Sequence, residues 1–286
     1  MREHLSHFSA AQMWDIPCFD TVIGFKIAET NAIDITVPKQ EARFRNNGKL
    51  VHSCQCNLPI SALTIRNGKT VSSPELVFLE LAGKLSLHRL ILLGLQLCSH
   101  SPNHPSDAIT TKQKLQTFLN KTSRHRGHRK ALRAVKYVEN GSASIMESIA
   151  YMILTLPHDL GGYGLSGAVF NHEIKLKNEA QIRLGKSRCI TDLYYRQVKL
   201  AVEYDSFTYH STPSDQGKDM VRSAVLERQG IDVMHLSTIQ LYNKDACKDF
   251  AYNLAARLGK RMQIRAKRFN EMHTILRELL PDGKTL

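Results

Sequence analysis

The sequence has no apolar run long enough to cross a membrane, and its first residues, MREHLSHFSAAQMWDIP, lack the apolar stretch of a signal peptide. We therefore expect a cytoplasmic protein with no membrane partner. None of the 6 cysteines forms a C-x-x-C pair, so they are expected to be reduced thiols. The chain of 286 residues is longer than one small core needs, which predicts two domains.

One cysteine cluster stands out, HSCQC at residues 52–56. Alternation along a strand would place His52, Cys54 and Cys56 on one face, where they could hold a metal ion. No second group of ligands accompanies them in the sequence. Half-buried cysteines on a strand are therefore the preferred interpretation.

Acidic residues are missing from Ala108 to Val138, and the formal net charge of the whole chain is +13. A second basic cluster runs from Arg257 to Arg268. Surface patches of one sign bind polyanions by releasing counterions, so DNA is the expected partner; a merely solvated face is the alternative. The side chains expected to contact nucleic acid are Arg124, Arg126, Arg129, Lys130 and Arg133, with Lys218 and Arg222 from a later helix.

Turn and cap signals predict a smaller α+β domain over residues 1–105. Asn67-Gly68 supplies the two left-handed positions of a tight hairpin between two strands. Ser73 and Ser86 are typical N-caps, and the second of the helices they begin is apolar almost all round. That apolarity indicates a helix buried on most sides.

The rest of the chain is expected to contain a basic helical linker over residues 106–140 and a second domain over residues 141–286. The second domain shows the order helix, three strands, helix, strand, helix. This order predicts an α/β domain with a mixed sheet flanked by helices. In the helix after the third strand, Val221, Ala224 and Val225 are expected to face inward.

Acidic residues lie on two neighbouring apolar strands of the second domain, ITDLYY and KLAVEYDS. Residues two apart on a strand share a face, so Glu203 and Asp205 point the same way. An antiparallel pairing brings Asp192 alongside, and Glu147 on the preceding helix is a fourth carboxylate. Such a group cannot stay fully ionised without a cation, which predicts a site for Mg²⁺ or Mn²⁺.

The predicted metal ligands are Asp192, Glu203 and Asp205. A bound ion can polarise a phosphoryl oxygen and activate water, and His210 could act as general base or hold the scissile phosphate. An exposed hairpin with solvated acids and a surface histidine is the alternative interpretation. Glu147, three residues after Ser144, also fits the ordinary position of a helix capping box.

Residues 141–245 resemble the very-short-patch-repair (Vsr-like) branch of the PD-(D/E)XK nuclease superfamily. The resemblance rests on ITDLYY, LAVEYDSFTYH and KDMVRSAVLERQGIDVMHLS. It implies a restriction-endonuclease-like fold and a site made of Glu147, Asp192, Glu203, Asp205 and His210. It also matches Asp219 and Arg222 to the following helix, where Arg222 would reach a carboxylate or a phosphate.

Two positions depart from this family pattern. The lysine of the superfamily, two residues after Glu203, is replaced by Asp205, as is usual in this branch. The glycine that follows the aspartate is replaced by Ser206. The missing lysine leaves the general base open, while the metal ligands are kept.

The first domain resembles AbiEi-type antitoxins through HLSHFSAAQMWDIP, VHSCQCNLP and VSSPELVFLELAGKLSLHRLILLGLQLC. Many of these proteins begin with a DNA-binding winged helix, and this sequence starts beyond that position. The resemblance therefore implies a domain that positions DNA or binds a protein partner.

Taken together, these patterns predict a metal-dependent endonuclease that hydrolyses DNA phosphodiester bonds. The alternative is a non-catalytic nucleic-acid-binding regulator, or an antitoxin-like protein, that keeps the nuclease core as a scaffold. Acidic residues at all the matched positions favour the enzyme.

Overall fold

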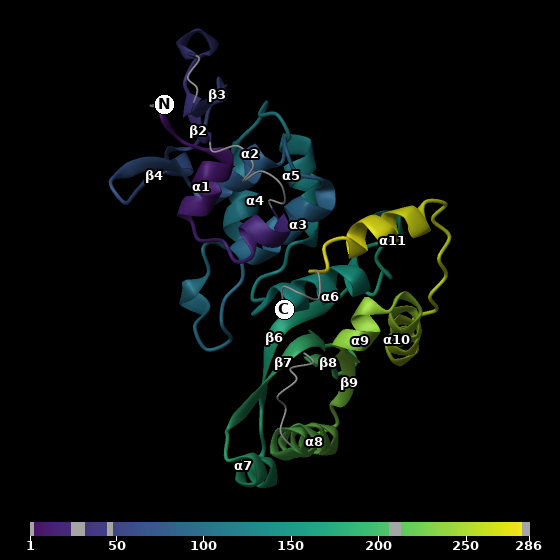
Figure 1. Cartoon of the computed structure of the whole chain (residues 1–286). Coiled ribbons are helices and arrows are strands. Elements are labelled where there is room, and N and C mark those ends of the chain that lie inside the picture. The colour runs from purple at the N-terminus through teal and green to yellow at the C-terminus, as the bar shows by residue number, and fades with distance from the viewer. Residues whose placement is uncertain (1–2, 24–31, 45–47, 206–212, 282–286) are drawn as a thin grey trace. The chain divides into compact units, whose positions relative to one another are not determined.

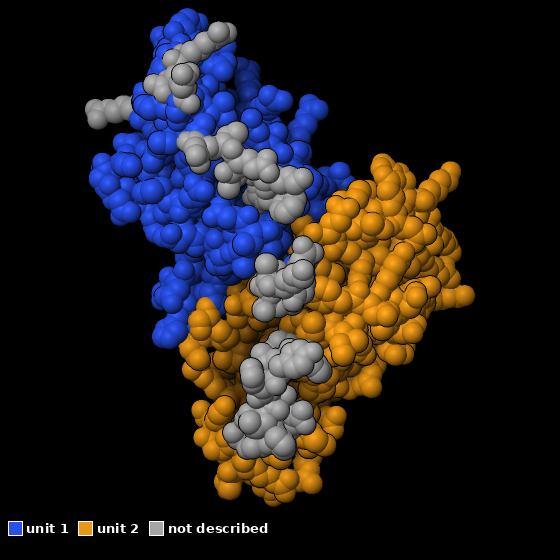
Figure 2. All heavy atoms as spheres, in the orientation of Figure 1, with its two compact units in different colours: residues 1–100, 104–140, 281–286 blue, residues 101–103, 141–280 orange. Residues whose placement is uncertain are grey.

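In the computed structural model, the chain is described over residues 3–23, 32–44, 48–205 and 213–281, with only the backbone for residues 213–219. It divides into two compact units (Figures 1 and 2). Unit 1 comprises residues 1–100, 104–140 and 281–286, and unit 2 comprises residues 101–103 and 141–280. Each unit has a mixed sheet flanked by helices, which confirms the α/β expectation. Within the described ranges, no helix is both long and apolar enough to cross a bilayer.

Unit 1 contains a five-stranded sheet in the order β3-β2-β1-β5-β4. Its strands are β1 (His4–Leu5), β2 (Ile33–Val37), β3 (Lys49–Ser53), β4 (Leu63–Arg66) and β5 (Lys69–Ser72). The hairpin between β4 and β5 turns at Asn67 and Gly68, whose φ angles of 49° and 73° are both left-handed. The predicted hairpin is therefore confirmed.

Five α-helices accompany this sheet within the described residues of the unit. They are α1 (His7–Met13), α2 (Pro74–Leu81), α3 (Leu87–Leu97), α4 (Lys112–Lys121) and α5 (His128–Ala134). The hydroxyls of Ser73 and Ser86 accept hydrogen bonds from the first turns of α2 and α3, as their positions predict. Helix α3 is buried over nearly its whole length, which agrees with its continuous apolarity.

The basic segment 106–140, expected as a linker, packs inside unit 1. Its apolar residues supply core contacts; Leu115, Phe118 and Leu119 of α4 and Ala131 and Ala134 of α5 are buried. Gly127, with φ of 89°, starts α5 so close to the α2–α3 turn that a Cβ would lie 2.6 Å from the Gly83 nitrogen. Leu115, Phe118 and Leu119 recur at helical spacing, so they bury one face of α4 and leave its basic residues outside.

Unit 2 contains a four-stranded sheet in the order β6-β7-β8-β9. The strands are β6 (Ala168–Lys175), β7 (Arg188–Tyr195), β8 (Leu200–Asp205) and β9 (Asp232–Ser237). Strands β6, β7 and β8 pair antiparallel, and β9 pairs parallel with β8 because helix α8 carries the chain back between them.

The helices of unit 2 follow the predicted order, with three that the sequence did not reveal. Helix α6 (Ile145–Thr155) precedes the sheet, α8 (Pro213–Arg228) joins β8 to β9, and α10 (Lys244–Arg257) follows. The additional helices are α7 (Asn178–Leu184), α9 (Thr238–Tyr242) and α11 (Phe269–Arg277).

Helices α6 and α8 cover opposite faces of the unit 2 sheet. The Tyr151 ring of α6 lies 4.7 Å from Phe170 on β6, and Val225 and Leu226 of α8 join a core with Tyr194 and Ala201. Alternate residues on a strand point to opposite faces, so Glu203 and Asp192 lie on the α8 side with these two.

The expected inward side of α8 was partly wrong. Val221 is 48% exposed and Ala224 is also exposed, whereas Val225 and Leu226 are buried. The helix is rotated so that Arg222 and Ser223, about one turn before the buried pair, face the sheet. These two residues therefore contact the acidic and histidine side chains of β8 and β9.

Candidate metal and nucleic-acid site

The pairing of β7 with β8 brings two of the predicted carboxylates side by side. Tyr194 pairs with Ala201 and Leu193 with Val202, so the same antiparallel register places Asp192 opposite Glu203. The Oδ2 atom of Asp192 accepts a 2.8 Å hydrogen bond from the backbone N–H of Tyr204. The two strands thus hold the carboxylates on the sheet face that α8 covers.

Burial and mutual repulsion raise the pKa of three of these carboxyl groups. Burial, reinforced by the charge of Asp192, raises the pKa of Glu203 to about 7. The same two causes raise the pKa of Glu147 to about 7. Burial also raises the pKa of Asp192 itself, and the charge of Asp205 acts in the same direction. Asp192 is therefore the residue through which the four predicted carboxylates interact.

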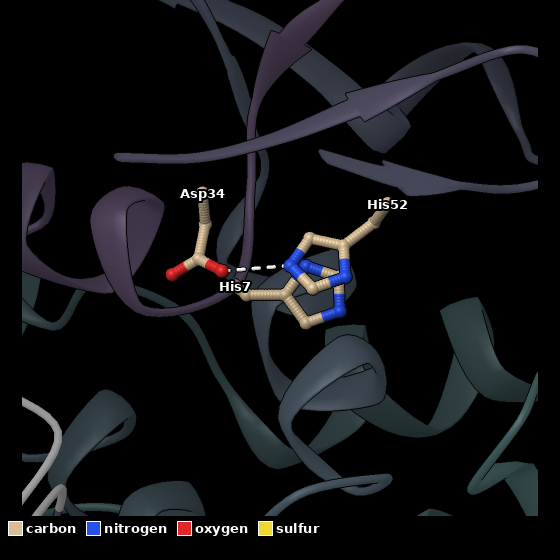
Figure 3. Close-up of side chains that lie close together, drawn as sticks. All are labelled: His7, Asp34 and His52. Atoms are coloured by element: carbon tan, nitrogen blue, oxygen red, sulfur yellow. Dashed lines mark hydrogen bonds and ion pairs between the residues drawn. The ribbon is translucent and has the colours of Figure 1, made fainter. Parts of the chain in front are cut away.

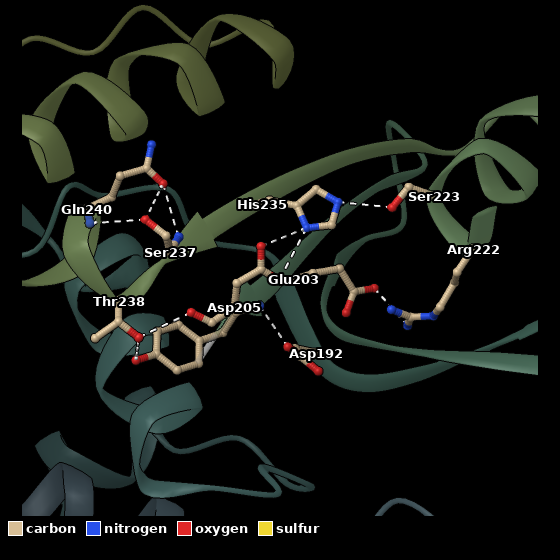
Figure 4. Close-up of polar contacts among 10 residues, drawn as sticks. Asp192, Glu203, Asp205, Arg222, Ser223, His235, Ser237, Thr238 and Gln240 are labelled. Carbon is tan, nitrogen blue, oxygen red and sulfur yellow. Dashed lines mark hydrogen bonds and ion pairs between the residues drawn. The ribbon is translucent and has the colours of Figure 1, made fainter. Parts of the chain in front are cut away.

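Two of the carboxylates have basic partners on neighbouring elements (Figure 4). The guanidinium of Arg222 donates to Glu203 at 3.0 Å and also to the carbonyl of Ile190. The Nδ1 atom of His235, on β9, lies 3.1 Å from Asp205, and its Nε2 atom lies 3.0 Å from the hydroxyl of Ser223. Arg222 therefore reaches a carboxylate, one of the two roles that the family resemblance implies for it.

Sequence reasoning missed His235. It is in register with Glu203 across the parallel β8–β9 pair, so both side chains share a face of the sheet. Its bond to Asp205 and the surrounding negative charge raise its pKa. The sequence shows His235 only as a single histidine in the strand IDVMHLS. Without the pairing of β8 with β9, its position does not reveal which residues it will contact.

Glu147 combines a local structural role with membership of the acidic group. The Ser144 hydroxyl accepts a 3.1 Å bond from the Glu147 N–H, which caps α6 as predicted. The Glu147 carboxylate accepts from the backbone N–H of Ala143 at 2.9 Å and from the amide of Asn171 at 3.3 Å. Asn171, with φ of 44°, interrupts the β6–β7 ladder at the position that faces Asp192.

The donor set fits a hard divalent cation. Carboxylate oxygens are the ligands that Mg²⁺ prefers, and this ion keeps several waters while it binds one or two protein carboxylates. Such an ion needs no close-packed protein cage. Among the described residues, ligand atoms of three side chains lie within 4.8 Å of one another at His7, Asp34 and His52 of unit 1, and the acidic group of unit 2 is less closely spaced. Asp192, Glu203 and Asp205 would therefore hold an ion partly through water.

Several predicted residues fall outside what the structure describes. His210, the predicted base, and Ser206 lie in the segment 206–212. Lys218 and Asp219 belong to α8, and their side chains are not among those described. Their roles stay predictions.

The predicted DNA-contacting residues of unit 1 are mostly exposed. Arg126, Arg129 and Arg133, together with Arg124 in the preceding loop, carry their charges outward. Lys130 differs, because it is half-buried and its Nζ atom donates to the carbonyl of Leu85 at 2.9 Å. The outward arginines form a positive surface on α5 and the loop before it.

A second basic surface lies on unit 2. Lys260, Arg261 and Arg265 line an open cavity of about 430 Å³ together with His158 and Tyr163. Lys260 donates to the carbonyl of Ser166 at 3.0 Å, while Arg261 and Arg265 are exposed. This surface includes part of the predicted C-terminal basic cluster.

Comparisons with protein-family models, with curated proteins and with solved structures find no match to this chain, so the resemblances described from its motifs stay predictions.

Proposed function

We propose that unit 2 is a metal-dependent endonuclease that hydrolyses DNA phosphodiester bonds. The observation that carries this proposal is the acidic group around Asp192, in which Glu147 and Glu203 both have a pKa raised to about 7. Buried carboxylates that repel one another form a site prepared for a cation, and strongly perturbed groups concentrate at functional sites.

The order of elements supports the same proposal. The acidic and basic residues follow one another along the chain in the order that the resemblance implies. They are a glutamate on α6, an aspartate on β7, the Glu203–Asp205 pair on β8 and an arginine on α8. The four-stranded sheet then brings the strand residues to one face, although they are separated in sequence.

In this mechanism, Asp192, Glu203 and Asp205 would hold Mg²⁺ or Mn²⁺. Such an ion would lower the pKa of bound water and stabilise the charge that develops on the phosphate. Arg222 favours the ionised form of Glu203 and so limits the rise of its pKa, because its guanidinium is bound to that carboxylate. His235 is a second candidate base beside His210; Asp205 orients its ring through Nδ1, and a proton can be accepted at Nε2.

DNA would be held by phosphate contacts from exposed arginines such as Arg126, Arg129 and Arg133. These contacts carry no sequence information, so they would supply general affinity.

The test is incubation of the purified chain with supercoiled plasmid and with single-stranded DNA, in Mg²⁺, in Mn²⁺ and in EDTA. We expect nicking or linearisation that needs the metal. Glu203→Gln should remove it, while Glu173→Gln should not, because Glu173 lies on the same sheet in an exposed pair with Arg188. Absence of cleavage under all metal conditions would overturn the proposal.

One observation favours a non-catalytic alternative. Asp192, Glu203 and Asp205 each already have a protein partner, namely the Tyr204 N–H, Arg222 and His235. The same acidic group could therefore stabilise a DNA-binding scaffold without an ion. Metal-independent DNA binding with no cleavage is the outcome that would support this regulator.

A further inference from the structure

Unit 1 contains a polar layer between its sheet and helices that the proposed nuclease site does not use. His4 pairs with Thr36 across β1 and β2, and Thr36 pairs with His52 across β2 and β3. These three side chains therefore form a row on one face of the sheet, and Asp34, two residues before Thr36, lies on the same face.

Two histidines and one aspartate of this layer converge (Figure 3). The Nε2 atom of His52 lies 2.7 Å from Oδ1 of Asp34, and the rings of His7 and His52 stack with centroids 3.8 Å apart. One ligand atom from each of the three residues lies within 4.8 Å of the others. His7 begins α1, whereas Asp34 and His52 come from adjacent parallel strands.

This layer is too deeply buried to be a solvated surface. Asp34 is 4% exposed and Glu80, on α2, is 3% exposed. Burial of a carboxylate costs free energy unless it finds partners, and burial of two in one layer needs several. The Thr36 hydroxyl, between His4 and His52 in the row, is buried with no hydrogen-bond partner in the described part of the chain.

The surroundings of His7 also suit a ligand. The Nδ1 atom of His7 lies 3.1 Å from the Ser6 hydroxyl and 4.0 Å from Glu80, which leaves Nε2 for an ion. The φ angle of His7 is 48°, a left-handed conformation that is costly for a residue other than glycine and recurs at functional sites.

We infer that His7, Asp34 and His52 form a binding site for a transition-metal ion of the Zn²⁺ class. Two imidazoles and a carboxylate are a preferred donor set for such ions, and bond lengths of about 2.1 Å in a tetrahedron place ligand atoms roughly 3.4 Å apart. The three ligand atoms, which lie within 4.8 Å of one another, therefore need to move closer as a group, while the 2.7 Å contact between His52 and Asp34 needs to open. An added water would complete the coordination.

The cysteines of HSCQC lie outside this group. Strand β3 ends at Ser53, and Cys54 and Cys56 follow it as half-buried free thiols. Neither thiol belongs to the group of ligand atoms formed by His7, Asp34 and His52. His52 therefore belongs to a site different from the His-Cys-Cys arrangement that the sequence alone suggests.

The test is titration of the full-length wild-type chain with Zn²⁺ by calorimetry, followed by X-ray absorption of the zinc-loaded protein. We expect one ion per chain, scattering from two imidazoles and no zinc–sulfur distance. His52→Ala should weaken binding at least about 100-fold. His104→Ala, at an exposed histidine of the same unit, is the matched control and should bind as the wild type does.

Two further measurements keep the outcome interpretable. Fluorescence of Trp14, the single tryptophan of the chain, reports whether His52→Ala still folds in unit 1. A chain with Asp192→Asn and Glu203→Gln should bind Zn²⁺ normally, so the result is independent of nuclease activity. Absence of zinc binding by the wild type, equal affinity in folded His52→Ala, or zinc–sulfur scattering would each overturn the inference.

Discussion

Both units bury acidic groups between a sheet and its helices, but they balance the charge differently. In unit 1, Asp34 and Glu80 lie among histidines; burial alone would raise the pKa of Glu80, but hydrogen bonds from His4 and from the backbone N–H of His7 help to lower it. In unit 2, burial and the charge of Asp192 raise the pKa of Glu147 and Glu203. Unit 1 thus matches its acids with imidazoles, whereas unit 2 has an excess of acid.

This difference separates the kinds of ion that the two units suit. An excess of carboxylate oxygen favours a hard ion such as Mg²⁺, while paired imidazole and carboxylate favour Zn²⁺. The protein carries both donor sets in separate sheets. Experiments that change one set should therefore leave the other unaffected.

The largest effect is expected from Asp192→Asn. The amide oxygen can still accept the bond from the Tyr204 N–H, so the fold should persist while the central charge is removed. DNA cleavage should fall by at least about 10²-fold, the low end for groups that act directly in a reaction, while DNA binding survives. Plasmid cleavage and fluorescence anisotropy measure the two. A variant that cleaves at the wild-type rate would remove Asp192 from the site.

The next largest effect concerns the partner of Glu203. Arg222→Met leaves a buried carboxylate without its cation, which should lower the free energy of unfolding by about 3 kcal/mol at pH 8. Adding Glu203→Gln should restore most of that stability, because no buried charge then remains. Urea unfolding checks both. Arg188→Met is the control: its partner Glu173 is 43% exposed, so about 1 kcal/mol or less is expected.

The two units should respond to pH in opposite directions. In unit 2, the raised pKa of Glu147 and Glu203 means that the folded state holds protons which the unfolded chain releases above about pH 4.5. Their contribution to stability is therefore complete below that pH and is lost as pH rises towards about 7. In unit 1, the pKa of His7 is lowered from 6.5 to about 4, so its contribution is lost as pH falls through that interval.

Each of these contributions is on the order of 2 kcal/mol or more, since one pKa unit corresponds to about 1.4 kcal/mol. Trp14 fluorescence follows unit 1 in urea unfolding, and far-ultraviolet circular dichroism follows both units. Combining Glu147→Gln with Glu203→Gln should flatten the pH dependence of the dichroism transition and leave the Trp14 transition unchanged. A Trp14 transition that moves with these substitutions would contradict the independence of the two clusters.

The sequence predicted caps and turns better than contacts between elements that are distant in the chain. Caps at Ser73, Ser86 and Ser144 and the turn at Asn67-Gly68 depend on a few adjacent residues, and all four were confirmed. Alternation also predicted that Asp192 could lie beside Glu203, because one hairpin sets that register.

Contacts that depend on long-range register could not be predicted in this way. His235 meets Asp205 across a parallel crossover, and His7 meets His52 from an element 45 residues away in the chain numbering. The basic segment 106–140 was expected as a helical linker between two domains. Its spaced apolar residues, such as Phe118 and Ala131, are what pack it into unit 1.

The smallest effect on folding, with a clear effect on binding, is expected from reversing Arg126, Arg129 and Arg133 to glutamate. These side chains are exposed, so the free energy of unfolding should change by no more than about 0.5 kcal/mol. Lys130 is left unchanged because it bonds the Leu85 carbonyl. DNA affinity should fall about tenfold or more for all sequences alike, and the salt slope should flatten by roughly 0.9 for each phosphate that is no longer neutralised. The same reversal at Arg261, Arg265 and Lys267 is the matched control on unit 2. If only this control changes the DNA affinity and its salt dependence, the unit 1 arginines are a solvated face. Unit 2 would then carry the DNA contacts as well as the acidic group.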